Sequence, residues 1–161
     1  MMLIRKAVED DYEAVLRIMN QVQDMHVEWR PDIYKHTDEL IPQAGYLAAQ
    51  AGDVFYVAEE EGKVIGVMGL DYRHVETPSH VTRDVVFIDS MAVDEPYRGR
   101  GAGHAFFAKV KEIAVERHAD GIELQVNARN RQAYDMYVKY GFREKSINME
   151  LPEWKTADQN V

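Results

Sequence analysis

Two periodicities of apolar residues alternate along the chain, and together they predict a mixed fold. Short runs rich in β-branched and aromatic residues, bounded by turn residues, predict strands, whereas apolar residues that recur every three or four positions predict amphipathic helices. The predicted strands are residues 2–8, 54–59, 64–73, 85–93, 122–127 and 142–151, and the predicted helices are residues 11–28, 37–51, 102–118 and 130–140. The resulting order, β-α-α-β-β-β-α-β-α-β, predicts an α/β or α+β sandwich with helices on both faces of a sheet.

The middle of the chain predicts an antiparallel pair of strands followed by a polar loop. Residues 54–59 and 64–73 are joined by residues 60–63 (EEGK), a length and composition typical of a hairpin. Residues 74–84 are polar and contain a proline, so we expect an exposed loop there, leading into the strand 85–93.

The stretch from Val85 to His104 joins an apolar strand to a glycine-rich loop and then to a helix. Glycine occupies three alternate positions within the run 97–103, so little side-chain bulk covers the backbone N–H groups where the helix begins. A strand, a bare loop and a helix N-terminus together form an anion-binding cradle. Arg98 and Arg100 add positive charge and donors suited to phosphate. We therefore expect a ligand that carries phosphate.

The spacing of the glycines separates several kinds of phosphate loop. A P-loop requires Lys and then Ser or Thr after its last glycine, but Gly103 is followed by His104. The dinucleotide fingerprint requires a glycine at the position that Phe106 occupies. The remaining pattern is Arg98-x-x-Gly101-x-Gly103. An ordinary loop with flexible glycines stays open as an alternative.

A second motif begins about thirty residues beyond this loop. It has the form Asn-x-x-Ala-x-x-x-Tyr-x-x-x-Gly-Phe, and its positions are Asn130, Ala133, Tyr137, Gly141 and Phe142. This run resembles a motif of the GCN5-related N-acetyltransferases (GNAT). The pattern Arg98-x-x-Gly101-x-Gly103 resembles the acyl-CoA pyrophosphate loop of the same family. The resemblance is strongest over residues 85–151 and thin over the first fifty residues.

The resemblance implies a fold, a reaction and a cofactor site. The fold would be a single acyltransferase domain over residues 1–161, with a mixed, mostly antiparallel central sheet of about six to seven strands flanked by helices on both faces. The reaction would be transfer of an acetyl group from acetyl-CoA to a primary amine of a small metabolite or of a protein or peptide, by direct attack in a ternary complex. The implied cofactor-binding residues are Met91, Ala92, Val93, Arg98, Gly99, Arg100, Gly101, Ala102, Gly103, His104 and Asn130.

Asp89 is the candidate general base. An alkyl amine with a pKa of about 10.4 is neutral in only roughly one molecule in 2,500 at pH 7, so a carboxylate or a water chain that accepts its proton assists the attack. Asp89 lies on the predicted strand 85–93, where some members of the resembled family carry a base. Apolar Ile88 and Met91 would raise its pKa by desolvation. A structural carboxylate that caps a helix or pairs with an arginine is the alternative.

Tyr137 is the candidate general acid, because a phenol that protonates the departing thiolate speeds its release. Tyr137 matches the acid tyrosine of the resembled family, and Asn130 matches its cofactor-binding asparagine. The structural alternatives are that Tyr137 packs its helix onto the sheet, together with Tyr134 and Tyr140, and that Asn130 caps the helix N-terminus.

Composition narrows the classes of function further. The chain has 161 residues, 46% of them hydrophobic, which suits one domain with one core. It contains no cysteine, which excludes a cysteine acyl-enzyme and favours direct transfer, and its six histidines show no metal-ligand spacing, so we expect no metal. The net charge of −9 disfavours a nucleic-acid partner and suits a cationic substrate.

No apolar run approaches eighteen residues and no basic-then-apolar leader is seen, so we expect a cytoplasmic protein without a membrane partner. A homodimer is expected from the habit of the resembled family and from the aromatic tail around Trp154. Two other functions stay open: a non-catalytic acyl-CoA-binding regulatory domain and a nucleotide-binding module without acyl chemistry. The amine acceptor is not specified by these motifs.

Overall fold

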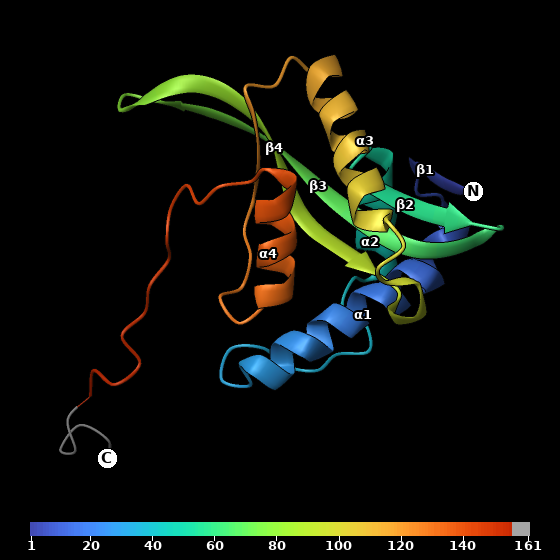
Figure 1. Ribbon diagram of the computed structural model, residues 1–161, viewed down its shortest axis with the longest axis horizontal. Helices are drawn as coiled ribbons and strands as arrows, with labels where there is room; N and C mark the ends of the chain where they lie inside the picture. The colour runs from blue at the N-terminus through green and yellow to red at the C-terminus, as the bar shows by residue number, and fades with distance from the viewer. Residues whose placement is uncertain (156–161) are drawn as a thin grey trace. The chain divides into compact units, whose positions relative to one another are not determined.

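The structure, a computed structural model, describes residues 1–155. Its strands are β1 (Met2–Lys6), β2 (Phe55–Glu60), β3 (Lys63–Thr77), β4 (His80–Val93) and β5 (Gly121–Leu124). Its helices are α1 (Tyr12–Trp29), α2 (Gln43–Ala51), α3 (Ala102–Glu116) and α4 (Arg131–Tyr140), with the short 3-10 helices η1 (Glu9–Asp11) and η2 (Glu95–Tyr97) (Figure 1). The chain forms two compact units, Met1–Asn127 and a second unit that begins at Ala128. The expectation of a single acyltransferase domain stays a prediction.

The first unit is built on one mixed sheet. Its strands lie in the order β1-β2-β3-β4-β5, and every neighbouring pair is antiparallel except β4 and β5, which are parallel. The parallel pair is joined by α3, as a strand–helix–strand crossover requires. The predicted class, a mostly antiparallel mixed sheet in an α/β or α+β fold, is confirmed. The described residues contain five strands rather than the six to seven expected.

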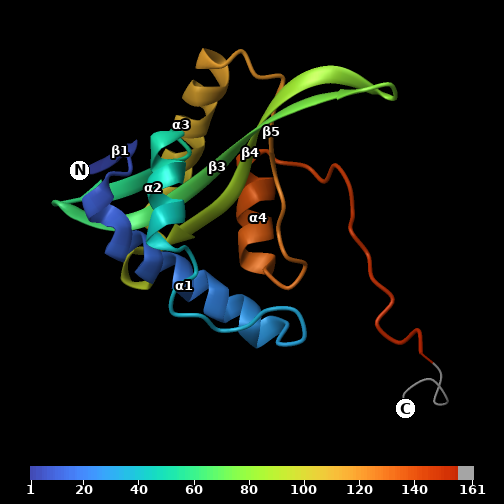
Figure 2. The ribbon, with the colours of Figure 1, turned by 180° about the vertical axis from the view of Figure 1, so that it is seen from behind.

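Helices cover both faces of this sheet (Figures 1 and 2). On one face Ile18 of α1 and Tyr46 of α2 are fully buried against Val57 of β2, in a core that also contains residues of β3 and β4. On the other face α3 lies close to the sheet, since a methyl group added at Gly66 would stand 3.1 Å from the Phe106 ring. Glycine at position 66 therefore permits the close approach of α3.

A partly buried ion-pair network holds the first strand to the start of α1. Arg5 on β1 donates to both carboxylate oxygens of Asp11, at 2.7 and 3.0 Å, and its Nε donates to Glu59 on β2 at 2.7 Å. The carboxylate of Asp11 also accepts the N–H of Val8 at 2.8 Å. Burial acts to raise the pKa of Asp11, but the hydrogen bonds from Arg5 and Val8 outweigh burial, and the pKa is lowered.

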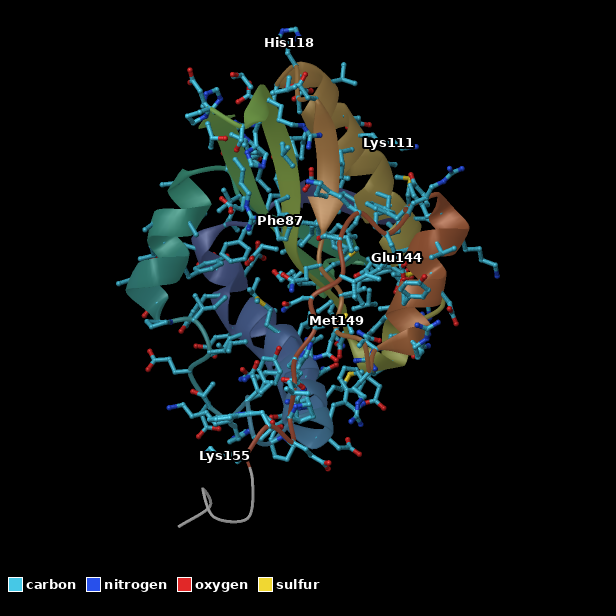
Figure 3. All side chains as sticks on the ribbon, turned by 90° about the vertical axis from the view of Figure 1, so that its left-hand side faces the viewer. Phe87, Lys111, His118, Glu144, Met149 and Lys155 are labelled. Carbon is cyan, nitrogen blue, oxygen red and sulfur yellow. The ribbon has the colours of Figure 1, made fainter. Side chains whose placement is uncertain are left out.

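The expectation of a polar loop over residues 74–84 is wrong. The strands β3 and β4 continue as a hairpin until Thr77 pairs with His80, with one shift of register between Val75 and Thr77. Cross-strand contacts stabilise this extension: His74 lies 2.7 Å from Asp84, and the Arg73 guanidinium lies 3.5 Å from the ring centre of Phe87, which is labelled in Figure 3. Most of its residues are exposed, so no alternation of apolar and polar positions marks the strands.

The expectation of a last strand over residues 142–151 is also wrong, because no residue between Phe142 and Lys155 is in a strand. Ile147, Met149 and Leu151 have the alternation of a strand but are 71%, 85% and 72% exposed. Met149 is labelled in Figure 3. An alternating pattern specifies a face, whereas a strand also needs a partner for its backbone groups. Trp154 is 63% exposed, and the expected homodimer stays a prediction.

The predicted helices are confirmed with small changes of their ends, apart from the second. The helix expected over residues 37–51 begins only at Gln43, after Pro42. Proline lacks an N–H and disfavours helical geometry in the residue before it, which explains the late start. The strand expected over residues 122–127 is shortened to Gly121–Leu124.

The Asp11 network generates a stability prediction. Asp11→Asn should lower the free energy of unfolding by about 2 kcal/mol at pH 7, because it removes the charge that pairs with Arg5. The folded pKa of Asp11 is lowered, so the stabilisation is present above the unfolded value, about 3.9, and is lost as the pH falls through the folded pKa. Urea denaturation at pH 7 and pH 3 measures both effects.

The matched control for this experiment is Asp10→Asn, since Asp10 neighbours Asp11 but is exposed. It should change the free energy of unfolding by less than about 0.5 kcal/mol. Equal losses in the two variants would contradict the account of the network.

Candidate functional site

The loop between β4 and α3 takes its shape from two glycines with positive φ. Gly99 has φ +77° and Gly101 has φ +94°, a region that other residues enter at a cost. A methyl group added at either glycine would meet no atom within 4 Å. Gly101 is the N-cap of α3. The loop therefore leaves open space beside its backbone at the point where the helix begins.

The N-terminus of α3 has no side-chain cap among the described residues. The first helical hydrogen bond runs from the N–H of Ala105 to the carbonyl of Gly101, at 3.0 Å. The N–H groups of residues 102–104 therefore precede the hydrogen-bonded part of the helix. Such groups carry partial positive charge and bind phosphate oxygens. Of these residues Ala102 is buried, Gly103 half-buried and His104 exposed.

The two arginines of the loop have different surroundings. Arg98 turns back onto the protein, where its Nε donates to the carbonyl of Val93 at 3.0 Å. Arg100 is 55% exposed, with its Nη1 3.6 Å from a carboxylate oxygen of Glu60 and its guanidinium 4.9 Å from the ring centre of Tyr97. Both place positive charge next to the start of α3, and direct contact of either with phosphate stays a prediction.

Beyond Ile88 one edge of β4 is without a strand partner in the first unit. The strand β5 pairs with β4 only over Val85–Ile88, whereas β4 continues to Val93. Asp94 donates its N–H to the carbonyl of Ile65, so the main chain of Asp94 points toward β3. Main-chain groups alternate along a strand, and those of Met91 and Val93 therefore point toward the open edge.

Ala92 differs from these neighbours, although it belongs to the predicted cofactor-binding set. Its main-chain groups point toward β3, where it is the pairing partner of Val67, and its side chain is buried in the core beneath α1. The geometry thus gives no support to a cofactor contact at Ala92, while it leaves Met91 and Val93 well placed.

Asp89 is the extra residue of a β-bulge. Gly69 pairs with Ser90, and the next residue, Leu70, pairs with Ile88, so Asp89 has no partner on β3. The bulge lies where the pairing of β4 with β5 ends. Asp89 is exposed, so the expected burial against Ile88 and Met91 does not occur. The bulge instead presents an accessible carboxylate beside the open edge of β4.

The second unit contains the other predicted site residues. Asn130 caps α4, because its Oδ1 accepts the N–H of Ala133 at 3.2 Å. Tyr137 lies about two turns beyond Asn130, in edge contact with Phe142, their ring centres 5.9 Å apart. Burial raises the pKa of Tyr137, so its phenol stays protonated at neutral pH. The hydroxyl of Tyr134, by contrast, donates to Glu144 at 3.0 Å.

Sequence reasoning missed the residues that hold the loop in place. Asp94 is 3% exposed and bonds to Arg17 and Gln21 of α1. Two signals were available: Arg17 and Gln21 are polar residues four apart on an amphipathic helix, and Asp94 directly follows a buried strand. Neither signal indicates that these residues meet.

The described residues contain neither a cluster of metal ligands nor a membrane-spanning helix. Within residues 1–155 no group of three or more His, Cys, Asp or Glu side chains is arranged to hold a metal ion. No helix in the same part of the chain is long and apolar enough to cross a membrane.

Comparison with known proteins identifies relatives of the chain. It is 33% identical over 102 residues to an uncharacterized N-acetyltransferase of Methanocaldococcus jannaschii, a match that covers 63% of this chain and 44% of that protein. It is also 33% identical over 102 residues to the N-acetylaspartate synthetase of Xenopus tropicalis, covering 63% of this chain and 35% of that protein. The chain thus matches less than half the length of these two relatives.

A solved structure and a family model agree with these relatives. The crystal structure of a tetramutant of the BH1408 protein from Bacillus halodurans is similar with a TM-score of 0.84 and 31% identity, covering 93% of this chain and 99% of that one. The model of the acetyltransferase (GNAT) family matches residues 19–142, which include the glycine loop, the β4 bulge and α4. The chain therefore belongs to the GNAT acetyltransferase family.

Proposed function

We propose that the chain transfers an acetyl group from acetyl-CoA to a primary amine of a small metabolite or of a protein or peptide, by direct attack in a ternary complex. Family membership supports acetyl transfer. The observation that carries the proposal is the uncapped N-terminus of α3, which follows two positive-φ glycines with open space beside them. The identity of the acyl donor, acetyl-CoA, and the class of acceptor, a primary amine, are the parts that we propose beyond family membership.

The proposed contacts with acetyl-CoA come from two parts of the first unit. The N–H groups at the start of α3 would donate hydrogen bonds to the diphosphate oxygens, and the positive charge of Arg98 and Arg100 would favour binding. The amide-containing pantetheine arm would pair with the main chain of Met91 and Val93, as an added strand pairs with an open sheet edge. The bound thioester supplies an activated acetyl group.

The reaction needs a base that accepts the proton of the amine and an acid that assists the departing thiolate. The amine nitrogen forms a bond to the acetyl carbon while the carbon–sulfur bond breaks and the sulfur leaves as a thiolate. Asp89, exposed at the bulge, takes the proton that the amine loses, directly or through water. Tyr137 stabilises the departing thiolate by donating a hydrogen bond from its phenol, which keeps its proton because its raised pKa lies above the ordinary thiol pKa of about 8.5. Asn130 positions α4 as its N-cap.

The proposal is tested by an acceptor screen. The protein with acetyl-CoA should release free thiol only when an amine acceptor is present, and the screen includes amino acids, polyamines, aminoglycosides and peptide N-termini. Binding of CoA without thiol release from any acceptor would instead support a non-catalytic acyl-CoA-binding domain. Binding of ATP or NAD in place of CoA would contradict the proposal altogether.

Gly101→Glu should weaken CoA binding at least about 100-fold, because it introduces a negative charge beside the diphosphate and a side chain at φ +94°. Isothermal titration calorimetry with CoA measures the loss. Gly62→Glu is the matched control, since Gly62 has φ +78° and open space but lies in the turn between β2 and β3. If the two variants bind CoA equally well, the cradle lies elsewhere.

Tyr137→Phe should lower kcat at least about tenfold while the Kd for CoA stays within about twofold, because only the acidic proton is removed. Steady-state kinetics and calorimetry measure the two quantities. The matched control is Tyr134→Phe on the same helix, whose hydroxyl bonds to Glu144 and which should keep its kcat. An unchanged kcat in Tyr137→Phe removes this phenol from the chemistry.

A further inference from the structure

A buried carboxylate links the end of β4 to α1. The side chain of Asp94 is 4% exposed, and its Oδ2 accepts from Nη1 of Arg17 at 2.8 Å. Its Oδ1 accepts from Nε2 of Gln21 at 2.9 Å. Arg17 and Gln21 are one turn apart on α1 and so share a face of the helix. Burial acts to raise the pKa of Asp94, but these bonds outweigh burial and the pKa is lowered, so the carboxylate is charged at neutral pH.

Gln21 connects this carboxylate to the backbone of the glycine loop. Its Oε1 accepts the N–H of Glu95 at 3.1 Å and Nη2 of Arg98 at 3.4 Å. The reverse orientation of the amide would place its NH₂ against these two donors and its oxygen against the Asp94 carboxylate. One orientation of Gln21 therefore satisfies all its neighbours, with the donor side toward Asp94 and the acceptor side toward the loop.

Further bonds hold the segment that precedes the glycine loop. Arg98, held by Gln21, donates its Nε to the carbonyl of Val93 at 3.0 Å. The N–H of Tyr97 donates to the carbonyl of Asp94 at 2.8 Å, which closes η2. The segment from Asp94 to Arg98 is thus held by side chains from α1, directly before the two glycines that would otherwise give the loop wide conformational freedom.

We propose that Gln21, anchored by Asp94, is a positioning residue for the diphosphate of acetyl-CoA. It holds the loop in the conformation that presents the first amides of α3 before the cosubstrate arrives, so less conformational entropy is lost on binding. This inference rests on the proposed function, since it assumes that the loop holds a diphosphate. The inference gives a residue of α1, which lies 74 positions from Glu95 in the sequence, a role in positioning the binding loop.

The test compares two glutamines of the same helix. In Gln21→Met, Glu95 and Arg98 lose their acceptor, and the Kd for CoA should rise about five- to twentyfold, with a similar rise in the KM for acetyl-CoA. The kcat at saturating acetyl-CoA should stay within about twofold. Gln23→Met is the matched control, because Gln23 donates to the carbonyl of Lys35, away from the loop, and both constants should stay within about twofold.

A truncated acyl donor distinguishes positioning from a general effect on folding. Acetyl-pantetheine lacks the diphosphate, so its kcat/KM should be the same in Gln21→Met and in the wild type. Equal losses with acetyl-CoA and acetyl-pantetheine would overturn the proposal, because they would show a defect that is not specific to the diphosphate. If Gln21→Met does not fold, Asp94→Asn, which keeps the shape of the side chain, should give the same split between donors.

The outcomes also separate this inference from the proposed function. If the wild type and Gln21→Met bind CoA equally well, the positioning role of Gln21 is overturned. The proposed diphosphate site at the start of α3 is not affected by that result. If the wild type binds no CoA, the proposed function fails, and the positioning role fails with it.

Discussion

The parting of β4 from β5 is the constraint on which the candidate site depends. The two parallel strands pair only as far as Ile88, and β4 then continues to Val93 without a strand partner on that side within the first unit. The bulge at Asp89 marks the point where they part, and α3 begins just beyond the end of β4. One short stretch of chain therefore provides an open strand edge, an exposed carboxylate and an uncapped helix N-terminus. Each of these features leaves polar groups that a ligand can satisfy.

The rest of the first unit keeps this stretch rigid. Phe106 packs α3 against Gly66, which sets the distance of the helix from the sheet. From the other face, α1 reaches the loop through Gln21 and the buried Asp94. A loop with two positive-φ glycines is a poor binding site unless its neighbours restrain it, since each glycine adds conformational freedom. Packing on one face and hydrogen bonding on the other supply this restraint.

Sequence predicted the parts of the site that depend on local geometry. A loop position that needs positive φ favours glycine, so the glycines at 99 and 101 allowed the loop to be predicted from the sequence. The bulge at Asp89 and the anchor at Gln21 arise from pairing and packing between distant segments, and a single sequence does not record them. The same limit explains the missed hairpin over residues 74–84, whose exposed faces produce no alternation, and the strand expected over 142–151, whose pattern specifies a face but no partner.

The central claim is that the glycine loop and the first amides of α3 bind a diphosphate. Amide NMR spectroscopy of the wild-type protein tests this claim most directly. Addition of CoA to the ¹⁵N-labelled protein should shift the amide signals of residues 99–104 and leave that of Gly62 unchanged, and inorganic pyrophosphate should shift the same signals at higher concentration. Saturating CoA that leaves the amides of residues 99–104 unmoved would contradict the account.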